Sequence, residues 1–276
     1  MAEQHTPRSL IVSLYGAYGR SPDGAPLAVA ELIRLLGVLG VDAPSVRSSV
    51  SRLKRRELLI PRRTAEGAAG YALSDDARML LDDGDRRIYA RDEPRLSDGW
   101  VLAVFSVPEA ERHKRHLLRS RLARLGFGTA APGVWIAPAR LHEETRHTLE
   151  RLDLAPYVEL FRGDHLGFAA TAEAVSRWWD LPSITKLHEE FLDVHEPVLR
   201  AGPPATPEDA YRAYLLALDS WRRLPYADPV LPLELLPENW PGTRSAQVFL
   251  ALHELLHARG AEFVQPSGPG ARPQGA

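Results

Sequence analysis

The residues best suited to binding a charged partner lie in one stretch, 43–63, where basic side chains greatly outnumber acidic ones. Glu57 is its only acid, and the whole chain of 276 residues has a formal net charge of −2. Guanidinium groups bind phosphates through paired hydrogen bonds, so a local basic patch on a near-neutral protein indicates a surface for a polyanion. The basic residues are Arg47, Arg52, Lys54, Arg55, Arg56, Arg62 and Arg63.

Helical periodicity indicates which element carries this patch. Val46, Val50 and Leu53 recur at helical spacing and are expected to face a core. Asp42 is expected to cap the helix, and a preceding helix over 27–39 is expected to stop at Gly40. Two helices joined by a short glycine-containing turn, the second of them basic, form a helix-turn-helix signature, which favours DNA as the polyanion.

The first turns of such a recognition helix read base edges in the major groove. Arg47 or Arg52 could grip a guanine, a contact worth about 1–3 kcal/mol of discrimination. Basic residues near the helix end and on the following strand are expected to contact phosphates. The alternative is an ordinary solvated helix face. The predicted DNA-binding residues are Ser45, Arg47, Ser48, Ser49, Arg52, Lys54, Arg55, Arg56, Arg62 and Arg63.

The pattern of apolar residues and turns predicts an α+β fold in three segments. Residues 1–90 form a winged helix-turn-helix domain whose wing is a hairpin of 58–63 and 71–73. Residues 95–167 have the order βαββαβ, which is typical of a ferredoxin-like domain. Residues 168–262 form a helical domain, and the Pro/Gly-rich tail 263–276 is predicted to be disordered. Helices are expected at 171–179, 183–199, 207–223 and 243–259.

Four motifs, in this order, resemble those of the PaaX family of transcriptional repressors of phenylacetate breakdown. They are GVDAPSVRSSVSRLKR (Gly40–Arg55), RRIYAR (Arg86–Arg91), LGFGTAAPGVWIAP (Leu125–Pro138) and WRRLPYADPVLPLELLPENWPG (Trp221–Gly242). The resemblance implies a winged-helix N-terminus, a ferredoxin-like middle domain, a helical C-terminus and a homodimer. Founding members of the family release DNA on binding phenylacetyl-CoA.

The resemblance therefore implies three partners: a palindromic double-stranded DNA operator, a second copy of the chain and a CoA-thioester effector. One departure concerns the wing, because family wings are often strongly basic. Here its tip, 66–71, is nearly neutral. We therefore expect weaker wing-to-phosphate contacts or a different operator preference.

An aryl-CoA effector would need aromatic walls and basic groups for its phosphates. Aromatic and basic residues of the C-terminal half could supply both, although core or interface packing is the favoured reading of the tryptophans. The candidates are Trp178, Trp179, Trp221, Arg222, Arg223, Tyr226 and Trp240.

An enzymatic alternative comes from His253-Glu254-Leu255-Leu256-His257, which matches the HExxH zinc motif. A catalytic zinc needs a third protein ligand, and only Glu262 follows, too close for the usual arrangement. Leucines mark this helix as a packing element. We therefore predict no catalytic residue, metal or cofactor, and disfavour a zinc hydrolase. A winged-helix module for protein contacts is the other alternative.

Two further absences bear on function. The chain has no cysteine, which fits a cytoplasmic protein, and no apolar run approaches the ~20 residues of a membrane span. The middle segment also resembles the fold of the small CRISPR-adaptation nucleases. Ser106-Val107-Pro108 stands where those enzymes place a metal-binding Asp, so we predict a dimerisation scaffold without nuclease activity.

Overall fold

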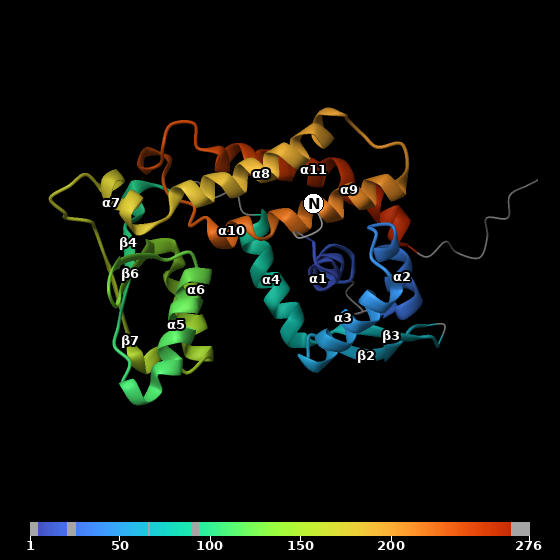
Figure 1. Cartoon of the computed structure of the whole chain (residues 1–276), viewed down its shortest axis with the longest axis horizontal. Helices are drawn as coiled ribbons and strands as arrows, with labels where there is room; N and C mark the ends of the chain where they lie inside the picture. The colour runs from blue at the N-terminus through green and yellow to red at the C-terminus, as the bar shows by residue number, and fades with distance from the viewer. Residues whose placement is uncertain (1–4, 21–25, 66, 90–93, 266–276) are drawn as a thin grey trace, which may run out of the picture. The chain divides into compact units, whose positions relative to one another are not determined.

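A computed structural model describes residues 5–20, 26–65, 67–89 and 94–265. The residues group into two compact units. The first comprises Met1–Tyr89, Phe191–Arg222 and Ala246–Ala276, and the second comprises Ala90–Glu190 and Arg223–Ser245. Figure 1 labels their helices and strands. Helices and two antiparallel sheets together give an α+β fold, as the sequence predicts.

The N-terminal part of the first unit alternates helices with a small sheet. Helices α1 (Pro7–Tyr18), α2 (Val29–Gly37) and α3 (Ala43–Arg55) precede the hairpin of β2 (Leu59–Arg63) and β3 (Ala69–Leu73). The two-residue strand β1 (Leu27–Ala28) pairs with β3, giving the sheet order β1-β3-β2. Helix α4 (Asp75–Tyr89) follows.

Local sequence explains where these helices begin. The Thr6 hydroxyl accepts a hydrogen bond from the Ser9 amide at 3.1 Å, and Pro7 occupies the first helical position of α1. The Asp42 carboxylate accepts one from the Ser45 amide at 2.8 Å, which confirms the predicted cap of α3. Each cap satisfies a backbone donor that the first helical turn leaves unpaired.

Helices from the C-terminal half complete the first unit. Helix α9 (Pro207–Trp221) and the later parts of α8 (Leu181–Arg200) and α11 (Pro241–Val264) belong to it. Tyr211, Leu215 and Val264 are buried in the same apolar core as α1, α2 and α3. The Tyr211 hydroxyl donates to the Leu35 carbonyl at 3.0 Å. The N-terminal helices therefore share one core with the C-terminal ones.

The second unit is built on a four-stranded antiparallel sheet. Its chain order is β4 (Trp100–Phe105), α5 (Arg112–Arg124), β5 (Gly128–Ala131), β6 (Val134–Pro138), α6 (His142–Arg151) and β7 (Val158–Gly163). The strands lie in the order β5-β6-β4-β7. This is the βαββαβ succession that the sequence pattern predicts. Val101 and Ala103 of β4 are buried with Leu118 and Leu122 of α5, so the helices cover this face of the sheet.

Alternate residues of β4 point to the other face, as expected for a strand. Trp100 packs there with Val175 of α7 (Thr171–Trp178), Trp179 and Leu231. The backbone of Trp178 approaches Gly128 of β5 closely: a Cβ added at Gly128 would lie 2.7 Å from the Trp178 carbonyl oxygen. The short helix α10 (Leu224–Ala227) also belongs to this unit. Directly after it, Asp228 Oδ2 lies 3.0 Å from the Nε2 atom of buried His188.

Several boundaries differ from those expected. Strand β3 begins at Ala69, two residues before the predicted start at Tyr71, so Ala69 and Gly70 belong to the strand. The predicted tail begins too early, since Phe263 and Val264 are helical and Val264 is buried. Residues 266–276 of that tail lie outside the described residues.

Candidate nucleic-acid interface

Helix α3 is held in place by its apolar face. Val46, Val50 and Leu53 are at most 3% exposed and pack in the core of the first unit with α1 and α2. The helix is therefore fixed in rotation, and the side opposite these residues is turned to solvent.

The outward side carries most of the predicted DNA-binding residues. The side chains of Arg47, Ser48 and Arg52 are exposed. Arg52 donates to the Ser48 hydroxyl at 2.9 Å, which aligns the two side chains along the helix. Lys54, Arg55 and Arg56, at the end of the helix, are exposed as well. Among the described residues, none of these basic groups is held in an ion pair with an acid.

Two of the predicted serines have other roles. Ser49 is 4% exposed and lies on the inner face of α3, so its prediction as a DNA-binding residue is wrong in this structure. It occupies the remaining position of the i, i+3, i+4, i+7 stripe formed with Val46, Val50 and Leu53. Ser45 is half-buried, and its hydroxyl donates to the Asp42 carboxylate at 2.8 Å. Hydrogen bonding to Ser45 holds the pKa of Asp42 below its ordinary value.

The hairpin adds two exposed arginines at the end of β2, next to the turn. Arg62 and Arg63 lie on β2, opposite Gly70 and Ala69 of β3. Arg63 donates to the Gly67 carbonyl at 2.7 Å, across the turn. All the predicted basic residues of this stretch are therefore at the surface of the first unit.

The HExxH histidines are engaged by aromatic and backbone partners. His253 Nδ1 lies 2.8 Å from the Tyr214 hydroxyl, which is 3.1 Å from the Tyr89 hydroxyl. His257 stacks on Tyr18 and its Nε2 lies 3.2 Å from the Ala17 carbonyl oxygen. Burial, with a contribution from His257, lowers the pKa of His253.

This arrangement does not match a zinc hydrolase. Glu254, which would act as the base, is exposed, away from the buried side of the helix. Within the described residues, no three His, Cys, Asp or Glu side chains are grouped as metal ligands. The motif forms a packed aromatic cluster in the first unit, and the donor set does not fit a catalytic zinc.

The predicted effector residues are divided between the two units. Trp221 and Arg222 belong to the first unit, whereas Trp178, Trp179, Arg223, Tyr226 and Trp240 belong to the second. Trp221 is buried and stacks on Phe249. Arg222 forms an ion pair with buried Asp219, 3.3 Å between Nε and Oδ1. Trp179 is buried and donates to the Gly126 carbonyl at 2.9 Å.

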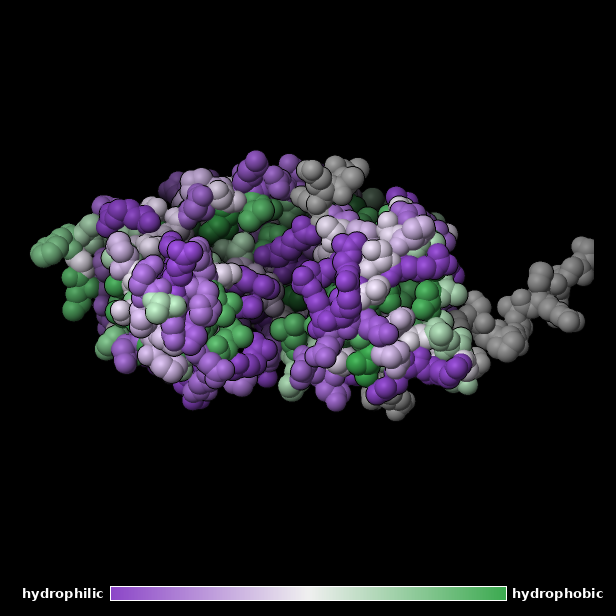
Figure 2. All heavy atoms as spheres, turned by 60° about the horizontal axis from the view of Figure 1, so that its bottom comes forward, coloured by the Kyte–Doolittle hydropathy of each residue, from purple (hydrophilic) through white to green (hydrophobic). Residues whose placement is uncertain are grey.

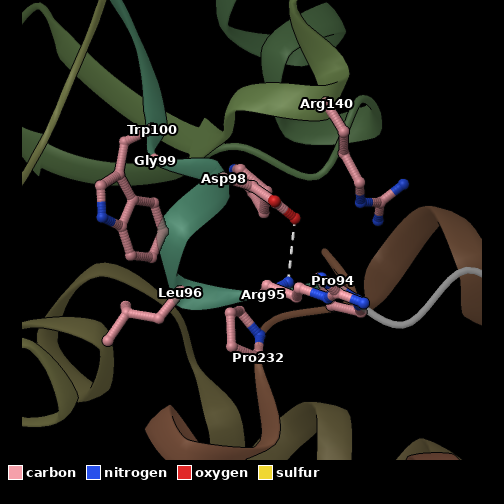
Figure 3. A pocket seen from close by; sticks show the side chains of 9 residues that line it. Pro94, Arg95, Leu96, Asp98, Gly99, Trp100, Arg140 and Pro232 are labelled. Atoms are coloured by element: carbon pink, nitrogen blue, oxygen red, sulfur yellow. Dashed lines mark hydrogen bonds between the residues drawn. The ribbon is translucent and has the colours of Figure 1, made fainter.

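The second unit has a small hollow at the start of β4 (Figure 3). Trp100 and Arg140 line it, and the Arg95 amide donates to Asp98 Oδ2 at 2.9 Å. None of the seven predicted effector residues is among its lining residues.

The structure thus defines a two-unit α+β protein with an exposed basic helix packed into a helical core. No described helix combines the length and apolarity needed to cross a membrane. Three family models match successive parts of the chain: "PaaX-like protein" over residues 6–77, "PaaX protein central Cas2-like domain" over 93–175, and "PaaX-like protein C-terminal domain" over 179–266. The chain belongs to the PaaX family.

Individual relatives agree with this assignment. The transcriptional repressor PaaX of Escherichia coli (strain K12) is 27% identical over 267 residues, which cover 94% of this chain and 83% of that protein. The solved structure of an uncharacterized protein from Mycobacterium tuberculosis is similar with a TM-score of 0.63 at 23% identity. The match covers 96% of this chain and all of that one, and shows a common fold.

Proposed function

We propose that this protein is a transcriptional repressor and not an enzyme, and that its N-terminal region is a winged helix-turn-helix domain that binds operator DNA through α3. The observation that carries the proposal is the exposed side of α3, where Arg47, Ser48 and Arg52 project from a helix fixed by its buried face. The similarity to a transcriptional repressor over most of the chain supports it. Ser49 takes no part, because it is buried.

In this proposal Arg47 and Arg52 contact bases, and Ser48 contacts bases or phosphates. Lys54, Arg55, Arg56, Arg62 and Arg63 contact phosphates and set the position of the protein on the duplex. The protein acts in the cytoplasm as a homodimer on a palindromic operator, with one recognition helix for each half-site. The three successive family matches support a three-domain organisation. In this proposal the ferredoxin-like middle domain is the dimerisation scaffold.

Substitutions on α3 test the proposal. Operator DNA is sought by selecting bound fragments from the genome, and affinities are then measured at one fixed salt concentration. Arg47→Ala and Arg52→Ala should each weaken operator binding by about 1–3 kcal/mol and weaken binding to random duplex much less. Unchanged operator affinity in the double variant would contradict the assignment of α3 as the recognition helix.

The effector is proposed from the family resemblance: an aryl- or acyl-CoA whose binding releases DNA. Such a ligand must bind the two conformations of the repressor with different affinities. A thermal-shift screen of CoA thioesters tests this, since a ligand that prefers the folded protein raises its melting temperature. A screen in which no thioester raises the melting temperature or weakens DNA binding would rule out this effector class.

The protein-interaction module remains the second candidate for the winged helix. A salt-dependent interaction with duplex DNA that is lost in the α3 variants separates the two. A protein-only module would bind duplex weakly and equally with or without Arg47 and Arg52.

A further inference from the structure

Helix α5 of the second unit has an unusual composition. Its thirteen residues, RHKRHLLRSRLAR, include five arginines, one lysine and two histidines but no acidic residue. Two leucines, Leu118 and Leu122, are buried against the sheet and fix the orientation of the helix. The helix therefore turns a defined, mostly basic side to solvent.

Only two of these basic side chains form ion pairs with acidic residues of the described chain. Lys114 pairs with Glu111 at 3.2 Å and donates to the Tyr157 hydroxyl at 2.6 Å. Arg115 pairs with Glu109 at 3.3 Å and donates to the Val107 carbonyl at 2.8 Å. Both of these contacts hold the start of α5 against the neighbouring segment.

Three of the other arginines, Arg112, Arg119 and Arg124, are exposed, whereas Arg121 is half-buried. Arg112, His116 and Arg119 are exposed and spaced i, i+4, i+7, so they form one stripe along the helix. Arg124 is exposed at its end. Within the described part of the chain, no acidic side chain forms an ion pair with these three arginines. Figure 2 shows mostly hydrophilic side chains over the end of the second unit that carries α5 and α6.

Helix stability does not account for this stripe. Cations in the first turn of a helix oppose its dipole, and anions are favoured there. Yet the first turn of α5 contains Arg112 and no acid. Helix α6, on the same face of the sheet, is different: Arg146 there pairs with both Glu143 and Glu150 at 3.2 Å. Charge is balanced on α6 and is left unbalanced on α5.

The chemistry of the stripe selects its partner. Its outward residues are arginine, histidine, serine and alanine, whereas the leucines face the core. An amphipathic membrane helix needs an apolar face toward the lipid, and a protein interface usually has an apolar or aromatic centre. A helix of this length spans about 20 Å. Duplex DNA presents one phosphate charge for each ~1.7 Å of its axis. Over the length of this helix, several phosphates are therefore available to the exposed arginines.

We infer that the outer side of α5 is a second DNA-binding surface, which contacts the phosphate backbone of duplex DNA without reading its sequence. The identity of the polyanion as DNA rests on the proposed function. The contact is electrostatic and independent of base sequence, so its measurable sign is the dependence of affinity on salt.

The test measures binding of the full-length protein to a random-sequence duplex at several KCl concentrations by fluorescence anisotropy. The variant Arg112→Gln/Arg119→Gln removes two charges from the stripe. The control Arg146→Gln/Arg200→Gln removes two exposed charges that are paired with Glu143, Glu150 and Glu196. Melting temperatures of both variants establish that they are folded.

We expect the slope of log affinity against log salt to become shallower by about two units in the α5 variant, one for each lost phosphate contact. The control variant should keep the wild-type slope, and the discrimination between operator and random duplex should be unchanged in both. Equal slopes in the α5 variant and its control would overturn the inference while leaving the role of α3 intact. A wild-type protein that binds no duplex would overturn both the inference and the proposed function.

Discussion

Asp219 is a fully buried carboxylate at the end of α9, and it ties that helix to the start of the chain. It accepts hydrogen bonds from Ser9 and, at 2.8 Å, from Ser13, both on α1, and lies 2.9 Å from His5 Nδ1. Burial raises the pKa of Asp219, but the hydrogen bonds and the charge of Arg222 outweigh it and hold the pKa below its ordinary value. Asp219 is therefore ionised inside the first unit, where Arg222 and the hydrogen bonds stabilise its negative charge.

Removing this carboxylate should be costly because it leaves Arg222 and two hydroxyls without their shared partner. We predict that Asp219→Ala lowers the free energy of unfolding by about 3–5 kcal/mol, the usual cost of breaking a buried ion pair. Asp193→Ala is the matched control, since Asp193 is an exposed helical residue of the same unit. Urea denaturation measures both, and similar losses in the two variants would contradict the structural role of Asp219.

Ser49 illustrates what residue types alone hide. Its polar side chain predicts a surface position, whereas its spacing from Val46, Val50 and Leu53 predicts a buried one, and Ser49 is buried. The spacing was the better guide. The Asp219 network had no such signal, because nothing in the local sequence around Ser9, Ser13 or Asp219 indicates that α1 and α9 lie together.

At the scale of elements, the hairpin depends on close approach of β1 to β3. A Cβ added at Gly70 would lie 2.7 Å from the Leu27 carbonyl oxygen, which is backbone and cannot rotate away. Gly70 pairs with both Ala28 and Arg62, so it is the centre of the three-stranded sheet.

We predict that Gly70→Ala destabilises the first unit by about 1–3 kcal/mol, the usual cost of overpacking, and weakens DNA binding because Arg62 is displaced with the hairpin. Gly37→Ala is the control. Apart from its chain neighbours and the backbone of its own helix, no atom lies within 4 Å of its added Cβ, and the residue is helical. Replacing glycine at such a site is neutral or stabilising by about 0.4–1 kcal/mol. Equal melting temperatures for the two variants would contradict the packing described here.

The order of the elements was predictable because it depends on local signals. The cap at Asp42, the apolar stripe of α3 and the continuous apolar run of β4 all lie within a few residues of the element they define. The boundaries of β3 were less predictable, because Gly70 and Ala69 have poor strand propensity. They are held in the strand by pairing with Ala28, Arg62 and Arg63.

At the scale of the whole chain, sequence order did not reveal which helices share a core. The first unit takes α9 and the end of α11 from the C-terminal third. Tyr211 is fully buried there, and its ring centroid lies 5.3 Å from that of Phe263, with the two rings tilted against each other. Helical periodicity shows that each helix has an apolar face, but it does not say which other element covers that face.

The N-terminal region should therefore depend on the C-terminal helices for its stability. In the full chain, Tyr211→Ala should cost about 3–5 kcal/mol, the range for removing a large aromatic side chain from a core. A fragment of residues 1–89 should melt well below the full chain and bind DNA less tightly, because the α1 face around Leu14 becomes exposed. Thermal denaturation followed by circular dichroism measures both. A fragment as stable as the full chain would contradict the shared core.

Because the first unit buries ionisable groups, we also expect the free energy of unfolding of the protein to decrease in weak acid. Burial lowers the pKa of His195 to about 4, with a smaller contribution from His5. His195 is buried beside the Ser220 hydroxyl, 3.0 Å from its Nε2. Between about pH 6.5 and pH 4 the unfolded chain binds a proton at this residue and the folded chain does not. Unfolding is therefore favoured as the pH falls through that window.

We predict that the free energy of unfolding decreases by up to about 3 kcal/mol across this window, since each pKa unit corresponds to about 1.4 kcal/mol. Below it, Asp219 adds a second loss, because a carboxylate with a lowered pKa loses its stabilising charge only at more acidic pH. His195→Gln keeps a polar group near Ser220 but has no proton to gain, so its stability should be flatter from pH 6.5 to 4. His116→Gln, at an exposed site, should keep the wild-type profile. If both variants retain the wild-type loss, the acid sensitivity comes from groups other than His195.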